Sequence, residues 1–402
     1  MRCAAGAACA VLAVGWAATL SVGPWSDESV NDLFVYRSFA APVLEGAIPY
    51  RDVFLEYPPL AAPAIAAPGL LGTGEEVFRL AFAGWTLALA GAVLVLCGAL
   101  ARRTGGDRTR AMLAVACAPL LLGAMVRTHF DLAPVALTLG ALLLLVSGRP
   151  RAGMAVLGLG VMTKGFPLVV APVALAWLAA TNGRRAAFES TAAMATVSLA
   201  LVALAVAASP SGAVDALTYQ GDRPVQLEST PASVLLVLDG LGLGQARSVK
   251  SHRSDGLVHP ADDVISAISV GSVAALVAIL CLLAARGPGE PRRLVLASLA
   301  AVAAFACLGR ILSPQFLIWL VPLGALALAW GLNALAAAVA AAAVLTQVEF
   351  PARYFDVVDR EPGAIALVCV RNAVLIAVLA LAVRVLNGPV LTRSAIALRS
   401  SP

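Results

Sequence analysis

Apolar runs long enough to cross a lipid bilayer recur along this chain of 402 residues, and they constrain its fold more than any other feature. Hydrophobic residues make up 60% of the sequence, charged residues make up 13%, and the mean hydropathy is +0.90. A run of about 18 or more apolar residues can cross a hydrocarbon core of roughly 30 Å as a helix. Because lipid offers no partners to backbone polar groups, the sequence predicts an all-α polytopic membrane protein.

We expect about twelve membrane-spanning helices within one domain that covers residues 1–402. The fifth of them is short and is expected to stop part-way, at Lys164-Gly165. Two segments between the spans are long, at residues 23–78 and 209–263. The predicted spans are 3–22, 78–101, 111–126, 132–147, 152–163, 166–180, 188–208, 264–285, 294–309, 314–331, 333–348 and 364–386.

The basic residues indicate the orientation of these spans. If the N-terminus is cytoplasmic, 15 of the 28 basic residues fall on the cytoplasmic side, with only three acids, Asp107, Glu189 and Glu290. This bias obeys the positive-inside rule, so we expect both termini inside and both long segments outside. The net charge of +5 therefore reflects topology and does not indicate nucleic-acid binding. The basic residues predicted inside are Arg2, Arg102, Arg103, Arg108, Arg110, Arg149, Arg151, Arg184, Arg185, Arg286, Arg292, Arg293, Arg384, Arg393 and Arg399.

Short helices at the membrane surface are predicted in the first long segment. Asn31 or Asp32 can cap the first turn of one such helix, and Gly46 is well placed to end it. A helix of this kind lies in the plane of the membrane interface. Residues 58–71 are also apolar but carry four prolines, so we expect a second juxtamembrane element there and not a full crossing. The apolar stripe of the first helix is expected to include Leu33, Tyr36, Val43 and Leu44.

Several groups of residues resemble the motifs of one enzyme superfamily. In the first long segment they are Asp32-x-x-x-Tyr36, Gly46-x-x-Pro49-Tyr50-x-Asp52 and Glu56-Tyr57-Pro58-Pro59-Leu60. Later groups are Arg127-x-x-x-Asp131, Thr163-Lys164-Gly165-Phe166-Pro167, the stretch 223–229, and Ser313-Pro314-Gln315-Phe316-Leu317-x-Trp319. Over residues 1 to about 325 the chain resembles the GT-C superfamily of glycosyltransferases, and most closely glycosyltransferase family 87.

That resemblance implies an inverting transferase with a catalytic aspartate in the first outer segment and a lipid-linked sugar phosphate as donor. Family 87 includes actinobacterial enzymes that use polyprenyl-phosphate mannose, so mannose is the expected sugar. Elementary chemistry also favours a lipid-linked donor. Nucleotide sugars are cytoplasmic, so an active site on the outer side needs a sugar donor that crosses the membrane as a lipid. The leaving phosphate then needs cations, and the acceptor hydroxyl needs a carboxylate that takes its proton. The glycine-rich residues 240–244 stand alone and are interpreted as a turn, not as a phosphate cradle.

Asp32 is the predicted general base. The alternative is that Asp32 only caps a helix or is a solvated loop acid. Asp27 and Glu28 share its neighbourhood and are weaker candidates for the same role or for substrate binding. Tyr36 and Tyr57 belong to the same motifs and are expected near the substrate, although Tyr57 is more simply explained as shaping the loop.

Charged residues at the breaks between apolar runs are the predicted substrate-binding groups. Lys164 ends an apolar run and is expected to bind the donor phosphate; snorkelling or a structural ion pair is the alternative. Arg310, with Gln315 close behind it, stands at another such break and is the second candidate for the phosphate. Arg127 and Asp131 are assigned to substrate binding, but at a spacing of four residues they could simply pair with each other.

Glu228 is predicted to be a further acid of the substrate site, since it lies in a matching stretch of the second long segment. No metal or other cofactor is expected. The histidines and acids of that segment match no standard helical ligand set, and a solvated loop explains them better. The seven cysteines show no CxxC and are interpreted as small buried hydrophobic residues. The histidines and acids in question are His252, His259, Asp255, Asp262 and Asp263.

The sequence thus predicts a membrane enzyme that moves a sugar, expected to be mannose, from polyprenyl phosphate to a hydroxyl of a lipid or glycan. The expected partners are the lipid-linked donor, the acceptor and the bilayer, with no nucleic acid. The main rival class is a transporter or flippase of lipid-linked sugars. Such a protein should show paired broken segments in its two halves, and the acids here gather in the outer segments instead.

Overall fold

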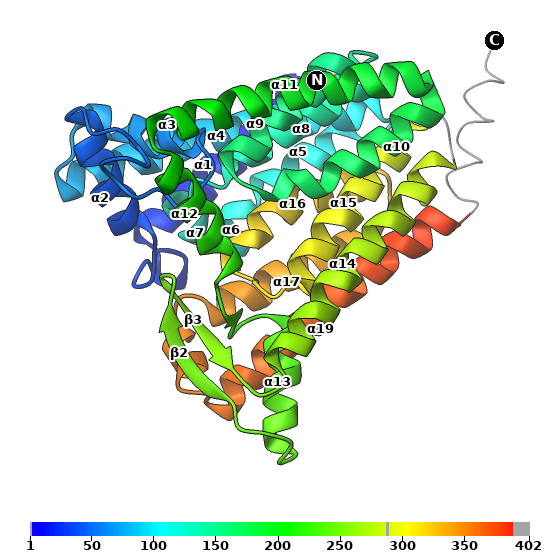
Figure 1. Cartoon of the computed structure of the whole chain (residues 1–402). Coiled ribbons are helices and arrows are strands. Elements are labelled where there is room, and N and C mark those ends of the chain that lie inside the picture. Colours follow the sequence, from blue (N-terminus) through cyan, green and yellow to red (C-terminus); the bar gives the residue numbers. More distant parts are fainter. Residues whose placement is uncertain (1, 287–288, 389–402) are drawn as a thin grey trace, which may run out of the picture.

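The computed structural model describes residues 2–286 and 289–388, and the side chains of residues 2–4 are outside this description. Arg393 and Arg399, two of the arginines predicted to be cytoplasmic, lie outside the described residues, as does the side chain of Arg2. Most of the chain is helical (Figure 1). The six cysteines with described side chains form no disulfide.

Eleven of the twelve predicted spans correspond to observed helices, with ends that differ by a few residues. Apolar runs bounded by charged or turn residues account for this agreement, because both ends of each run are marked in the sequence. Two of the helices, α10 and α16, are each preceded by a 3₁₀ turn, η3 (Phe166–Val169) and η4 (Pro314–Phe316). The helices are α1 (Arg2–Ser21), α4 (Glu75–Arg103), α8 (Leu132–Val146), α9 (Pro150–Thr163), α10 (Val170–Asn182), α11 (Arg184–Ala208), α14 (Asp262–Ala285), α15 (Pro291–Leu308), α16 (Leu317–Ala329), α17 (Asn333–Glu349) and α19 (Pro362–Asn387).

The remaining predicted span, 111–126, is not one helix. It is divided into α5 (Arg108–Ala116), α6 (Ala118–Leu122) and α7 (Met125–Thr128). Pro119 stands in the first turn of α6, where it lacks the backbone N–H that a continuous helix would need. Gly123 ends α6 with a φ of +56°, a conformation that favours glycine and does not continue an α-helix. The prediction of a single helix was therefore wrong at this place.

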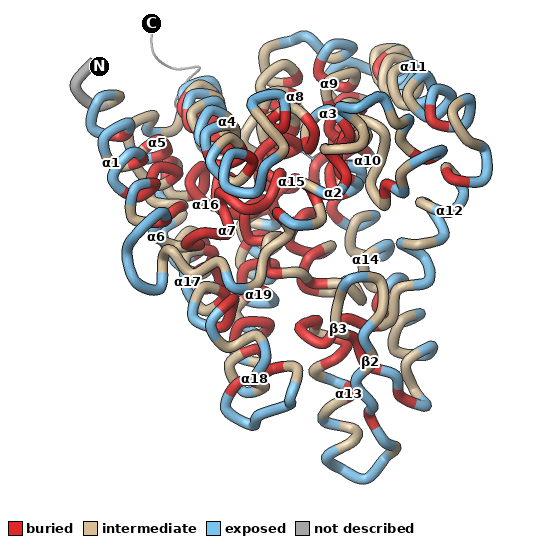
Figure 2. The backbone as a smooth tube through the Cα atoms, turned by 90° about the vertical axis from the view of Figure 1, so that its left-hand side faces the viewer, coloured by how far each residue is buried: buried red, intermediate tan, exposed pale blue. Residues whose placement is uncertain are grey.

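Five helices in the described part of the chain are long and apolar enough to cross a membrane: α4, α11, α14, α15 and α19. Helices α15 and α16 form the centre of the bundle, and almost every residue of both is buried (Figure 2). Helix α11 is the opposite case, because Leu199 and Leu204 are each 66% exposed and only Ser190 and Ala205 are buried. A helix that exposes large apolar side chains along its length suits a lipid environment.

The first long segment contains the two predicted short elements. These are α2 (Leu33–Leu44) and a pair formed by α3 (Ala61–Ala66) and the 3₁₀ helix η2 (Ala67–Leu71), preceded by η1 (Gly23–Trp25). Gly46 follows α2 with a φ of +105°, as the predicted stop signal requires. The predicted stripe was partly wrong. The buried face consists of Leu33, Tyr36, Phe39 and Ala40, whereas Leu44 is 38% exposed.

The prediction of an all-α protein was wrong for the second long segment. It contains α12 (Pro210–Gly221) and α13 (Thr230–Gly240), and also a three-stranded antiparallel sheet in the order β1-β3-β2. The strands are β1 (Val225–Gln226), β2 (Arg247–Ser251) and β3 (Ser254–Val258). They are short and polar, so they carry little of the alternating apolar pattern that marks a strand in a sequence. Both long segments lie at the same end of the helical bundle (Figure 1).

A close backbone contact joins the two long segments. A Cβ atom on Gly212 of α12 would lie 2.0 Å from the backbone oxygen of Tyr50. Gly212→Ala should therefore push α12 away from the first segment and destabilise the protein by about 1–3 kcal/mol, the usual effect of overpacking. The measurement is thermal unfolding of the purified protein in detergent.

Gly240→Ala in α13 is the matched control, because no atom lies within 4 Å of the new methyl group there. Its unfolding temperature should stay close to that of the parent chain. An unchanged unfolding temperature for Gly212→Ala as well would contradict the proposed close contact.

Candidate functional site

A cavity of about 890 Å³ lies where the two long segments meet the ends of the bundle helices. Its wall combines residues of the first segment, of α12 and the sheet, and of the breaks before α10 and α16. The cavity is large enough for a sugar with part of a lipid chain, since ligand pockets commonly measure about 300–1,000 Å³. Six of the eleven predicted site residues line it: Asp32, Tyr57, Lys164, Glu228, Arg310 and Gln315.

Asp32 is placed at the start of α2 but does not cap it. Asn31 does so instead, because its side-chain oxygen accepts a hydrogen bond of 2.8 Å from the backbone N–H of Leu33. The Asp32 carboxylate accepts a hydrogen bond of 3.0 Å from the hydroxyl of Tyr36, and 35% of the side chain remains exposed. Because Asp32 lines the cavity without a capping role, it is free to take part in chemistry.

His129 is a neighbour of Asp32 that the sequence reasoning missed. Its Nε2 lies 3.5 Å from the Asp32 carboxylate, and its side chain is only 2% exposed. On the other side of the ring, Nδ1 lies 3.1 Å from the carbonyl of Met125, which can only accept a hydrogen bond. The Thr128 hydroxyl lies 3.0 Å from the same nitrogen, so two neighbours hold this side of the ring while Nε2 faces Asp32. The only signal for His129 in the sequence was its position inside the Arg127-x-x-x-Asp131 motif.

Tyr36 and Tyr57 lie near Asp32 and pack against one shared aromatic ring. Phe130 packs edge-on against both rings, with centroid distances of 5.6 Å and 5.0 Å, and Tyr36 stacks on Phe82 at 5.4 Å. Burial raises the pKa of both hydroxyls well above the usual value, and the neighbouring carboxylates raise it further. Both tyrosines therefore stay protonated at neutral pH, and Tyr36 acts as a hydrogen-bond donor to Asp32.

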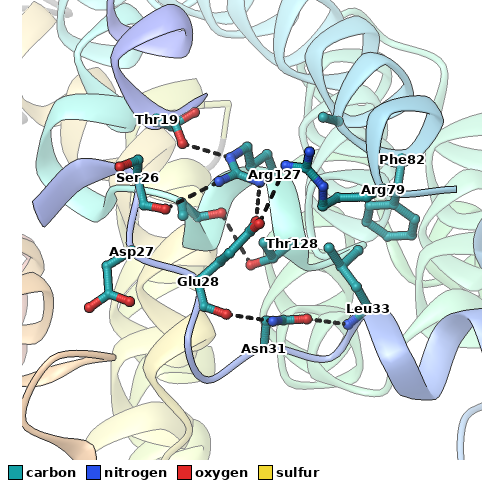
Figure 3. Close-up of polar contacts among 12 residues, drawn as sticks. Thr19, Ser26, Asp27, Glu28, Asn31, Leu33, Arg79, Phe82, Arg127 and Thr128 are labelled. Atoms are coloured by element: carbon teal, nitrogen blue, oxygen red, sulfur yellow. Dashed lines mark hydrogen bonds and ion pairs between the residues drawn. The ribbon is translucent and has the colours of Figure 1, made fainter. Parts of the chain in front are cut away.

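Glu28 is the centre of a partly buried ion-pair network (Figure 3). It pairs with Nη1 of Arg127, which is almost fully buried, and lies 3.4 Å from Nη1 of Arg79. Arg127 also donates to the backbone oxygen of Thr19 at 2.8 Å, so it ties α1 to the first long segment. Asp27 points away from this network, and neither Asp27 nor Glu28 lines the cavity (Figure 3). The pairing of Arg127 with Asp131, the alternative left open by their spacing, is not what the structure shows.

Asp131 pairs with Lys164 instead. Both carboxylate oxygens accept hydrogen bonds of 2.8 Å from the Lys164 ammonium group, and Trp319 Nε1 donates to Oδ1 at 2.6 Å. The side chains of Lys164 and Asp131 are 10% and 0% exposed. The ammonium group also faces the Phe130 ring at 4.8 Å from its centroid. The ion-pair alternative for Lys164 is thus the arrangement observed, at the wall of the cavity.

Arg310 and Arg223 are the cations of the cavity wall that have no carboxylate partner. Arg310 donates to the backbone oxygens of Gln220, at 3.2 Å, and Gly221, while Arg223 Nη1 lies 3.5 Å from the Gln220 side chain. In the part of the chain that the structure describes, neither guanidinium lies within 4.0 Å of a carboxylate. Nε of Arg223 is buried without a hydrogen-bond partner. Two such arginines beside one cavity can bind an anion.

Glu228 lines the cavity from the second long segment, and only 2% of the residue is exposed. Gln226 donates to its Oε2 at 2.9 Å, while Oε1 is buried without a partner. Burial and the nearby carboxylate of Glu349 raise the pKa of Glu228 well above its usual value, against the lowering effect of Arg371. A protonated Glu228 would offer a hydrogen-bond donor to a hydroxyl group in the cavity.

The histidines and acids of the second long segment form no evident metal site. Among the residues that the structure describes, no three His, Cys, Asp or Glu side chains lie close enough to hold a metal ion. His252 and Asp255 belong to the hairpin β2–β3 instead, where the Asp255 carboxylate accepts a hydrogen bond of 2.6 Å from Tyr354. His259 directly follows β3 and accepts a hydrogen bond from the Ala261 backbone N–H.

Comparison with known proteins adds three findings. No curated protein matches this chain. The crystal structure of ArnT from Cupriavidus metallidurans bound to undecaprenyl phosphate matches with a TM-score of 0.49 and 14% identity, over 93% of this chain and 76% of that one. The sequence pattern of glycosyltransferase family 87 matches residues 54–314, which is more than half of the chain and includes most of the cavity wall. This multi-pass membrane protein therefore belongs to glycosyltransferase family 87.

Proposed function

We propose that this glycosyltransferase moves a sugar, with mannose as the first candidate, from a polyprenyl-phosphate donor to a hydroxyl of a lipid or glycan. The observation that carries the proposal is one cavity bordered by an accessible carboxylate, Asp32, and by two arginines, Arg223 and Arg310, which pair with no carboxylate of the described residues. These groups match the two needs of the reaction, a base for the hydroxyl and cations for the leaving phosphate. The matched family range begins after Asp32, so the catalytic role of Asp32 rests on its geometry and on the resemblance of the first segment.

In the proposed reaction the acceptor oxygen attacks the anomeric carbon while Asp32 takes the hydroxyl proton. A new carbon–oxygen bond forms, and the bond between the anomeric carbon and the phosphate oxygen breaks. The electron pair of that bond leaves with the lipid phosphate, whose developing charge the arginines stabilise. Attack from the face opposite the phosphate inverts the anomeric configuration. Asp32, whose side chain is 35% exposed, then releases the proton to solvent, which restores the base.

The direct test is to incubate the purified protein with polyprenyl-phosphate mannose and a panel of hydroxyl acceptors, including alkyl glycosides and diacylglycerol. We expect consumption of the donor and one new glycoside whose anomeric configuration is opposite to that of the donor. Transport of the intact lipid-linked sugar across vesicles, without cleavage of its phosphate bond, would instead support the flippase alternative.

Arg310 and Arg223 are proposed to bind the donor phosphate. Arg310→Gln should lower kcat/KM for the donor by about tenfold to a hundredfold, because a hydrogen bond to a charged group is worth about 1.5–3 kcal/mol. Arg223→Gln should act in the same direction. The measurement is initial transfer rate against donor concentration.

Arg247→Gln is the matched control for both changes, because Arg247 is exposed on β2 and does not line the cavity. It should leave the donor kinetics unchanged. Donor kinetics that are normal in both Arg310→Gln and Arg223→Gln would remove the basis for the phosphate assignment.

The active site is proposed to face the outside of the cell. A cysteine that replaces Glu45 or Leu243 should react with a membrane-impermeant thiol reagent in intact cells, because both positions are exposed at the cavity end of the protein. A cysteine at Asn182, which is exposed at the end of α10, should react only after the cells are permeabilised. The opposite labelling pattern would reverse the proposed orientation.

A further inference from the structure

The turn between β2 and β3 extends into the wall of the cavity. Ser251 pairs with Ser254, so the turn consists of only two residues, His252 and Arg253. Both residues line the cavity, together with Ser254. The residues of this turn were not among the site residues predicted from the sequence.

The backbone of the turn is unfavourable for the residues that occupy it. His252 and Arg253 both have a φ of +53°. Two successive residues with positive φ are the signature of a type I′ hairpin turn, in which Asn-Gly is strongly preferred. Side chains with a Cβ atom are strained in this region, and such strain is typically found where residues serve a function. The hairpin therefore carries two large polar side chains at a place where its own stability favours small ones.

Neighbouring segments hold both side chains in position. The ring of Tyr219 packs edge-on against the His252 ring, with a centroid distance of 4.6 Å, and Phe54 packs against Tyr219 at 5.2 Å. Arg253 lies 3.9 Å from the carboxylate of Glu56, whose side chain is 11% exposed and also lines the cavity. The tip is thus fixed between α12 and the first long segment, which is the segment that carries Asp32.

We propose that this hairpin tip is the acceptor subsite and that it binds a sugar. The inference rests on the proposed function and adds to it the chemical class of the acceptor. An imidazole, a guanidinium, a carboxylate and the Ser254 hydroxyl together offer several donors and acceptors. The charges of Arg253 and Glu56 balance each other, which suits neutral hydroxyl groups. An anionic phosphate is better placed beside Arg223 and Arg310, which pair with no acid in the described part of the chain.

The test replaces the strained turn by the sequence that the turn prefers. In the double variant His252→Asn with Arg253→Gly, the thermal unfolding temperature should rise by about 1–3 °C because the backbone strain is relieved. The KM for octyl α-D-mannopyranoside as acceptor should increase about tenfold or more, since at least one hydrogen bond to a charged group is lost. The KM for polyprenyl-phosphate mannose should change less than about twofold. A purely structural turn would give the rise in stability without the change in acceptor KM, and that result would overturn the proposal.

A pair of single variants on the same hairpin separates the tip from the remainder of the sheet. Arg253→Gln removes a charge from the cavity, and Lys250→Gln removes one from an exposed position on β2 outside it. Only Arg253→Gln should raise the acceptor KM. Equal effects of both changes, or an effect on the donor KM alone, would assign the turn to another role.

Comparison of acceptors completes the test. The parent chain should transfer mannose to octyl glycosides at least about tenfold more efficiently than to dodecanol, which has a hydroxyl but no sugar. Equal use of both, with donor cleavage intact, would overturn the sugar subsite and leave the proposed function in place. The absence of donor cleavage with every acceptor would count against the proposed function itself.

Discussion

Replacing Asp32 with asparagine should slow sugar transfer by about a hundredfold or more, because the variant cannot take the proton from the acceptor hydroxyl. Asparagine keeps the size of the side chain, and its amide oxygen can still accept the hydrogen bond from Tyr36. Expression, thermal stability and the KM for the donor should therefore stay close to those of the parent chain. The measurement is kcat with polyprenyl-phosphate mannose and a saturating acceptor.

Asn31→Ala is the matched control for Asp32→Asn. It removes the side chain that caps α2 and should lower stability by about 1 kcal/mol; because Asn31 also lines the cavity, this comparison concerns stability and not transfer. Asp27→Asn should be close to neutral for transfer, since Asp27 does not line the cavity. If Asp32→Asn retained activity and Asp27→Asn lost it, the base would be assigned to Asp27. Activity that survived both changes and Glu28→Gln would refute a base in the first segment.

Breaking the buried pair between Lys164 and Asp131 should have the largest effect on stability. In Lys164→Met, the carboxylate of Asp131, which is 0% exposed, loses its ion-pair partner; among the described side chains it keeps the hydrogen bond from Trp319. Removing one partner of a buried ion pair typically costs about 3–5 kcal/mol. The variant should therefore unfold at a clearly lower temperature in detergent and accumulate at a lower level in the membrane.

The double variant Lys164→Met with Asp131→Asn distinguishes a structural pair from a phosphate ligand. It leaves no unpaired charge, so most of the lost stability should return. Transfer activity should return with it if Lys164 only positions the wall of the cavity. Restored stability without restored activity would show instead that the ammonium group also contacts the donor, as the sequence prediction had it. A single variant Lys164→Met with normal stability would show that the buried pair contributes little.

Much of the helical framework could be predicted from the sequence. The ends of α8 and α17 differ from the predicted spans by a single residue, because each apolar run ends at a polar or turn residue. The broken helix at residues 108–128 was not predicted. The stretch 111–126 is apolar and was interpreted as one span, although Pro119 and Gly123 interrupt the helix there. The short sheet of the second segment was missed for a related reason. Its strands are stabilised by pairing with each other. They contain too few apolar residues to show the alternation of apolar and polar residues that marks a strand.

For the candidate site, the sequence indicated which charged residues take part, but not which residues they pair with. Asp32, Lys164 and Arg310 could be selected because charged residues next to apolar runs need an explanation. Their partners could not be selected in the same way. Lys164 pairs with Asp131 across 33 residues, and Arg127 pairs with Glu28 across 99. The i, i+4 spacing of Arg127 and Asp131 indicated a pair that the structure does not form, because each finds a closer partner on another segment.

The sequence by itself determined that this chain is a membrane protein of many helices, that its acids gather in two long segments, and that its motifs resemble one family. The first two properties depend on local composition and periodicity, which any stretch of the chain carries by itself, and the third is a resemblance of short motifs. Only the tertiary structure decided which charges neutralise each other, that His129 faces Asp32, and that a strained hairpin tip borders the same cavity. Contacts between distant segments arise from the packing of the whole bundle, so no single stretch of sequence contains them.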